Sequence, residues 1–263
     1  GDQFGYSVSI SGNYAIVGAR DEQEDVNGQN TKGGAGAAYI FERNTTTGTW
    51  SEVQKIVASN RASQDQFGYS VSISGNYAIV GARREDEDAS GNNTKNEAGS
   101  AYLFERDANG NWSQVQKIVA SDRNGDDLFG WSVAIDGNYA IVGAREEDED
   151  VNGKNNKSAA GSAYLFERNA TTGTWSEAQK IVASDRAEND RFSSSVSISG
   201  NYAIVGALYE DEDASGQKTK SDAGAAYLFE RNATTGNWSE VQKIVASDRD
   251  SLDRFGSSVS ISG

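Results

Sequence analysis

The stretch FGYSVSISGNYAIVGA, residues 4–19, recurs almost unchanged along the chain and decides its fold. Later copies start at Phe67, Phe129 and Phe192, and a last copy that starts at Phe255 reaches Gly263. A fixed period of about 63 residues indicates a repeat protein in which each repeat is one supersecondary unit. We therefore predict one repeat domain, residues 1–263, made of repeats at 1–63, 64–125, 126–188 and 189–251 and a partial repeat at 252–263.

Each repeat contains four runs that predict β-strands. In the first repeat, residues 7–11 alternate polar and apolar side chains, which is the period of a half-buried strand. Residues 14–19 are nearly all apolar, which indicates a strand buried on both faces, and Gly12-Asn13 forms a two-residue turn between these runs. Residues 36–43 and 49–58 supply two further runs rich in β-formers. Four antiparallel strands per repeat predict an all-β fold, either a β-propeller or an array of propeller-like blades.

Composition narrows the chemistry available to the chain. The 39 acidic and 24 basic residues give a formal net charge of −15, which argues against nucleic acid and against anionic membrane surfaces as partners. No apolar run is long enough for a transmembrane helix, so we expect no membrane insertion. There is no Cys, His or Met, which excludes a Ser-His-Asp triad and a zinc site with nitrogen or sulfur ligands. Any metal would be a hard cation bound by oxygen.

The Phe-Gly opening at Phe4, the VSISG strand and the Gly18-Ala19 end of the next strand resemble FG-GAP repeats. Such repeats build the propeller of integrin α subunits and occur in many bacterial surface proteins. The resemblance covers essentially the whole chain, although Arg20 replaces the family's proline and Ser193 replaces a glycine. It implies a propeller, an extracellular or cell-surface location, and a structural or adhesive role.

FG-GAP propellers usually close with seven blades, whereas this chain carries four repeats and one further strand. Two alternatives follow. The chain is part of a larger propeller or an open array of blades, or the partial repeat pairs with the next molecule by strand addition. Because the chain starts at Gly1 without a methionine and shows no signal peptide, we also expect a mature or trimmed piece of a longer product.

An acidic loop follows the second strand of each repeat. In the second repeat, with Asp86 as position 1, oxygen-bearing side chains fall at positions 1, 3, 5, 9 and 12, and a glycine stands at position 6. This is the ligand spacing of an EF-hand loop, in which position 7 contributes its backbone carbonyl. The predicted Ca²⁺ ligands are Asp86, Asp88, Ser90, Asn92, Thr94 and Glu97 in the second repeat, and Asp211, Asp213, Ser215, Gln217, Thr219 and Asp222 in the fourth.

The other two loops are poorer in ligands. The third repeat keeps Asp148, Asp150 and Asn152 but has Ala159 at position 12, and the first keeps Asp25 and Asn27. The resemblance to integrin FG-GAP blades also implies calcium, in a loop that ends in aspartate at position 9, where this chain has Thr or Asn. We therefore predict that calcium is bound best in the second and fourth repeats. The alternative is a solvated acidic hairpin loop that keeps the protein soluble.

Two further residue types recur once per repeat. The tryptophans could stack on sugars, as in a lectin, but their fixed phase favours packing between blades; they are Trp50, Trp112, Trp175 and Trp238. The lysines of the QKIVAS run are predicted to be edge charges that discourage stray strand pairing rather than binding residues; they are Lys55, Lys117, Lys180 and Lys243.

We therefore expect a non-enzymatic, calcium-stabilised structural or adhesive protein, because a catalytic carboxylate pair is normally unique and these acids recur. Its expected partners are proteins, including further copies of itself within a larger surface protein or a self-assembling filament. A glycan-binding propeller is the alternative.

Overall fold

A computed structural model describes residues 1–217 and 219–263, and this part of the chain contains sixteen β-strands and no helix. Strands that follow one another in the sequence also pair in the sheet, so each repeat forms a four-stranded antiparallel meander. The strands are β1 (Phe4–Ser11), β2 (Tyr14–Ala19), β3 (Ala37–Arg43), β4 (Trp50–Ile56), β5 (Phe67–Ser74), β6 (Tyr77–Ala82), β7 (Ser100–Arg106), β8 (Trp112–Ile118), β9 (Phe129–Asp136), β10 (Tyr139–Ala144), β11 (Ser162–Arg168), β12 (Trp175–Ile181), β13 (Phe192–Ser199), β14 (Tyr202–Ala207), β15 (Ala225–Arg231) and β16 (Trp238–Ile244).

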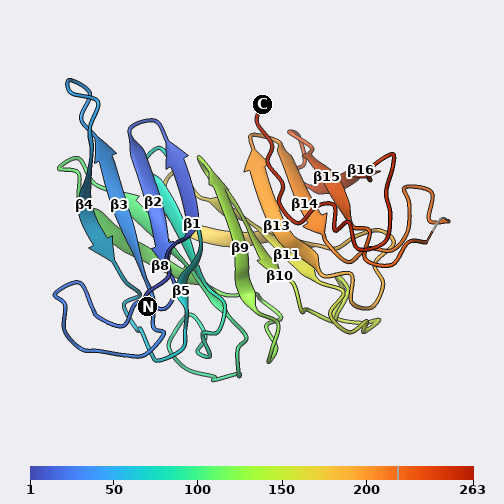
Figure 1. The fold of residues 1–263 in the computed structure, drawn as a ribbon, viewed down its shortest axis with the longest axis horizontal. Coiled ribbons are helices and arrows are strands. Elements are labelled where there is room, and N and C mark those ends of the chain that lie inside the picture. Colours follow the sequence, from blue (N-terminus) through green and yellow to red (C-terminus); the bar gives the residue numbers. More distant parts are fainter. Residues whose placement is uncertain (218) are drawn as a thin grey trace. The chain divides into compact units, whose positions relative to one another are not determined.

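The all-β prediction is confirmed, whereas closure into a propeller stays a prediction. The chain forms two compact units, Gly1–Gly137 and Asn138–Gly263. The first contains the sheets β1-β2-β3-β4 and β5-β6-β7-β8 together with β9, and the second contains β10 to β12 and the sheet β13-β14-β15-β16. Figure 1 shows β1 to β4 side by side in the first sheet.

The predicted turn at Gly12-Asn13 joins β1 to β2. Ser11 pairs with Tyr14 across it, and Gly12 has a φ of 57°, a left-handed conformation that glycine adopts readily. A register shift follows in the β3–β4 hairpin, where Phe41 pairs with Glu52 but Ile40 pairs with Gln54. This leaves Val53 as the extra residue of a β-bulge, and the same bulge recurs in β7–β8, β11–β12 and β15–β16.

Successive repeats pack closely through their first two strands. A Cβ atom added to Gly18 would lie 2.1 Å from the carbonyl oxygen of Gly68, so the backbones approach too closely for any side chain there. The hydroxyls of Ser7 and Ser9 accept hydrogen bonds from the backbone N–H groups of Val71 (3.0 Å) and Ile73 (3.2 Å). The serines that looked like solvent-facing residues of an alternating strand therefore bind the next repeat.

Candidate metal-binding loops and buried carboxylate clusters

The aspartate at position 3 organises each acidic loop. In the second repeat, Asp88 accepts hydrogen bonds from the backbone N–H groups of Ser90 (2.8 Å) and Asn92 (3.0 Å), and the Asn93 amide donates to its other oxygen (2.5 Å). The Ser90 hydroxyl also donates to Asp88, and this bond is the largest of the contacts that hold the pKa of Asp88 well below its usual range. Such turns, in which a carboxylate binds the backbone ahead of it, are typical of Asp.

The other three loops share this turn. The backbone N–H groups at position 5 donate to the aspartates at position 3, from Asn27 to Asp25, from Asn152 to Asp150 and from Ser215 to Asp213. The carbonyl of Asn92, which is the predicted metal ligand at position 7, accepts a hydrogen bond from the backbone N–H of Asp88 (2.8 Å) and keeps a second lone pair.

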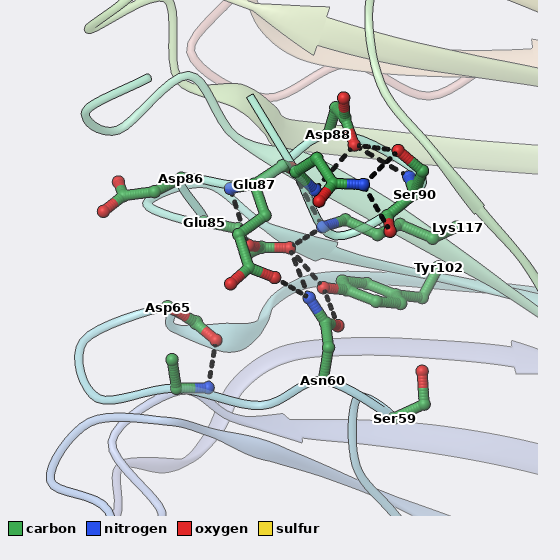
Figure 2. Close-up of polar contacts among 12 residues, drawn as sticks. Ser59, Asn60, Asp65, Glu85, Asp86, Glu87, Asp88, Ser90, Tyr102 and Lys117 are labelled. Carbon is green, nitrogen blue, oxygen red and sulfur yellow. Dashed lines mark hydrogen bonds and ion pairs between the residues drawn. The ribbon is translucent and has the colours of Figure 1, made fainter. Parts of the chain in front are cut away.

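The aspartate at position 1 closes the loop through the backbone of residue 12. Asp86 accepts from the N–H of Glu97 (2.7 Å), and Asp211 accepts from the N–H of Asp222 (2.7 Å). The Glu97 carboxylate lies 3.6 Å from the Arg84 guanidinium. Figure 2 shows the carboxylates of Asp86 and Asp88 pointing in different directions. The structure therefore brings the predicted ligands into one loop, where backbone amides already bind several of their oxygens.

Each acidic loop is clamped by an arginine that the sequence analysis did not single out. Arg123 donates to the backbone carbonyls of Asn93 (2.7 Å) and Asp86 (2.6 Å), and Lys95 in turn donates to the carbonyl of Arg123 (2.8 Å). Equivalent arginines hold the other loops; they are Arg61, Arg186 and Arg249. The recurrence of Ser-Asn/Asp-Arg at a fixed phase was the signal that could have revealed them.

A buried carboxylate lies directly before each loop. Glu85 is almost fully buried and accepts hydrogen bonds from the Tyr102 hydroxyl (2.6 Å), the Asn60 amide (3.2 Å) and the backbone N–H of Glu87 (2.9 Å). The Lys117 ammonium forms an ion pair with it (Figure 2). Burial alone would raise the pKa of Glu85, but the bonds from Lys117 and Tyr102 outweigh burial and lower it.

The lysines lie on the edge strands β4, β8, β12 and β16, as the edge-charge prediction expects, but their ammonium groups are paired with buried carboxylates. Lys117 and Lys243 are buried by their pairing with Glu85 and Glu210, and Lys180 pairs with Glu147 at 3.3 Å. A buried carboxylate needs a partner of opposite charge, and these ammonium groups supply it.

In the second compact unit, the group of side chains around the buried Glu210 contains one more acidic residue than the group around Glu85. The carboxylates of Asp185, Glu210 and Glu212 each offer an oxygen within 4.8 Å of the others, a spacing that could hold a metal ion. The Lys243 ammonium lies 2.7 Å from Asp185 and 3.1 Å from Glu210. The protein thus places its own cation beside this group, none of whose members was among the predicted ligands.

Packing explains three of the four tryptophans. Trp112 is buried, its backbone N–H donates to the Gln54 side chain (2.9 Å), and the Gln54 amide donates back to its carbonyl (2.7 Å). Trp175 and Trp238 are buried as well, and burial fits packing rather than sugar stacking for these three, whereas Trp50 is exposed.

The comparisons with known proteins are consistent with these repeats. A family model described as FG-GAP repeat matches residues 1–41, 50–104, 112–166, 175–229 and 238–263. FG-GAP repeats are found in extracellular and adhesion-type proteins. No curated protein matches the chain. Within the described residues, no helix is long and apolar enough to cross a membrane.

Proposed function

This chain belongs to the FG-GAP repeat family, and from that premise we propose that it is a non-enzymatic extracellular structural or adhesive protein stabilised by calcium. The observation that carries this proposal is the repetition itself. The buried carboxylate, its lysine and the clamped acidic loop recur from repeat to repeat, as parts of a scaffold do. A catalytic site normally uses one set of residues once.

The acidic loops are the proposed calcium sites, and their chemistry fits a hard cation because every candidate ligand is an oxygen. In the second repeat the ion would be held by Asp86, Asp88, Ser90 and Glu97. Glu97 would leave Arg84 to reach it, and Asp88 would give up its bond to Asn93. Because calcium must replace existing contacts, we expect weak affinity, about 10⁻⁴ to 10⁻³ M, as in other extracellular modules.

Thermal unfolding with and without calcium tests this proposal. A site with a Kd of about 1 mM gains about 1.4 kcal/mol at about 10 mM calcium, so the Tm should rise by a few degrees and fall again with a chelator. The double variant Asp86→Asn/Asp211→Asn should lose most of this response. The matched control Asp25→Asn/Asp150→Asn, which changes the ligand-poor loops, should keep it. If calcium and the chelator leave the Tm unchanged, the loops are held by their hydrogen bonds alone.

A further inference from the structure

The lysine of the fourth repeat lies between two carboxyl groups within the second compact unit. The Lys243 ammonium is 2.7 Å from Oδ2 of Asp185 and 3.1 Å from Oε1 of Glu210. The Lys243 side chain is 6% exposed, that of Glu210 is 2% exposed, and Tyr227 beside them is fully buried. A primary amine is therefore held against a carboxyl group in a place that largely excludes water.

The contacts of Tyr227 favour a protonated carboxyl group in this cluster. Its hydroxyl lies 2.8 Å from Oδ1 of Asp185 and 2.8 Å from Oε2 of Glu210. A hydroxyl carries one proton, so it donates fully to one of these oxygens, and the second contact is strong when the other carboxyl donates to the tyrosine. Glu210 also accepts from the backbone N–H of Glu212 (2.8 Å), which favours its anionic form. We therefore assign the proton to Oδ1 of Asp185.

The cluster contains the three parts that an amide-forming reaction needs. Lys243 is the nucleophile, the neutral carboxyl group of Asp185 is the electrophile, and Glu210 is a base in contact with the amine. The Lys243 ammonium also binds Oδ2 of Asp185, the oxygen that stays on the carbon, and polarises this carbonyl for attack. Because the fold holds amine and acid together, their encounter costs no further translational entropy.

We propose that Lys243 and Asp185 become joined by an intramolecular amide bond, which the side chains of this cluster form by themselves. Glu210 takes one proton from Nζ of Lys243, and the free amine attacks Cγ of Asp185. The bond from Nζ to Cγ forms and the bond from Cγ to Oδ1 breaks. A second amine proton passes to Oδ1, which leaves as water, and the Tyr227 hydroxyl, in contact with Oδ1 and Glu210, provides the path. An ammonium group, an acid and a carboxylate thus give an amide, a protonated Glu210 and one water molecule, so atoms and charge balance without a co-reactant.

The product ties two successive repeats together. Asp185 lies in the segment after β12, and Lys243 lies on β16, the outer strand of the next sheet, 58 positions further along the chain. A cross-link that closes so long a loop restricts the unfolded chain and so raises the Tm. Glu210 is neutral in the product, so its burial leaves no unpaired charge there. Asp185 is 28% exposed, which gives the released water a path to the solvent.

The first compact unit supplies the matched comparison. Asn60 stands at the position of Asp185, and its amide nitrogen donates to Glu85 (3.2 Å) and Glu87 (3.0 Å) (Figure 2). The Lys117 ammonium pairs with Glu85 and donates to the backbone carbonyl of Glu87 (2.9 Å). This cluster has the lysine and the base but an amide in place of the acid, so a change of Lys117 leaves the proposed bond intact.

Mass spectrometry of the whole chain, intact and after unfolding and digestion with trypsin, tests the bond. The wild type should lose one water molecule at this site and yield residues 181–186 joined to residues 232–249, uncut after Lys243 because trypsin does not cleave after an acylated lysine. Lys243→Arg, which keeps the charge, should regain the water and lose the joined peptide, and so should Asp185→Ala. The latter also identifies the partner, since residues 118–123 repeat the sequence of 181–186. Glu210→Gln should leave most of the chain unlinked, and the control Lys117→Arg should keep the joined peptide.

Three results would overturn the proposal. They are a wild type that trypsin cleaves after Lys243, a joined peptide that persists in Asp185→Ala, and a Glu210→Gln variant that is linked as fully as the wild type. Melting curves show that each variant is folded, and Lys243→Arg should melt below the wild type because it lacks the cross-link. The bond goes beyond the proposed function and needs no calcium. An unlinked wild type whose Tm still rises with calcium overturns this inference while the proposed function stands, and a linked wild type without any calcium response does the reverse.

Discussion

The buried ion pair between Lys117 and Glu85 offers the sharpest test of how a repeat is held together. The Lys117→Met change keeps the length of the side chain and removes its charge. Glu85 then remains in the interior with its hydrogen bonds from Tyr102 and Asn60 but without a counter-charge. The Lys117 side chain is 7% exposed and that of Glu85 is 2% exposed, so water cannot take over the role of the ammonium group.

The expected loss in the free energy of unfolding is about 3–5 kcal/mol at neutral pH, the usual result of leaving one partner of a buried pair alone. The sign of the pH dependence follows from the pKa of Glu85. In the wild type this pKa is lowered below the ordinary glutamate value of 4.5. The contribution of the ion pair to the free energy of unfolding is therefore fully present above pH 4.5 and is lost as the pH falls through the lowered pKa. Without Lys117, we expect burial to dominate and to raise the pKa of Glu85. Protonation of Glu85 in acid then removes the unpaired buried charge and stabilises the Lys117→Met variant. The difference between the two proteins should therefore shrink as the pH falls from 7 to 4.

Urea unfolding followed by tryptophan fluorescence measures this difference. Lys117→Met/Glu85→Gln should recover most of the loss, because an uncharged amide can keep the bonds to Tyr102 and Asn60. Lys55→Met is the matched control at a looser pair, 3.5 Å from Glu22 and less buried, and should cost less. The reasoning is refuted if Lys117→Met costs under about 1 kcal/mol, or if the double variant is no more stable than the single one.

Two further changes test burial and backbone geometry. Burial raises the pKa of Asp65 to about 7 from 3.8, so its ionisation opposes folding as the pH rises through this range. The advantage of Asp65→Asn over the wild type in the free energy of unfolding should therefore grow between pH 4 and 7. Urea unfolding at pH 8 should show a gain of up to about 4 kcal/mol. Asp253→Asn, on an exposed copy of the same turn, is the control and should gain less. Gly68→Ala should lower the Tm by more than about 10 °C, since its Cβ would lie 2.2 Å from the Ala37 carbonyl oxygen and its φ is 86°. Gly75→Ala, also at positive φ but with open space around it, should cost only about 1 kcal/mol. Equal losses of Tm for the two variants in thermal melts would contradict the close approach at Gly68.

Local pattern was enough to predict the strands. Residues 14–19 were predicted as one strand and β2 has these bounds, and the predicted turn at Gly12-Asn13 joins it to β1. Alternation and turn residues report on contacts only a few positions apart, and these runs are formed by such contacts. The period of the repeat then extends each local prediction to the whole chain.

The buried cluster could not be predicted in the same way, because it depends on one irregular residue. Counted from the turn that joins β7 to β8 without a bulge, Tyr102 would pair with Gln116. The extra residue Val115 shifts the register, so Tyr102 pairs with Lys117 instead and both face Glu85. A shift of one residue moves a side chain to the opposite face of a sheet, so the position of Lys117 beside Glu85 depends on a bulge that the local pattern does not reveal.

The two compact units balance charge differently around the same buried glutamate. In the first unit, Asn60 donates its amide to both Glu85 and Glu87, so the cluster holds two carboxylates and one lysine. In the second unit, Asp185 takes the place of Asn60. The Lys243 ammonium pairs with Asp185 and Glu210, and Glu212 adds a third carboxylate within 4.8 Å of these two. Burial and then the charge of Glu210 raise the pKa of the nearby Asp190 to about 7, as burial does for its counterpart Asp65 in the first unit. One Asn-to-Asp difference thus replaces an amide donor with a third carboxylate near a single ammonium group, so repeats of nearly identical sequence differ in the charge around the same buried glutamate.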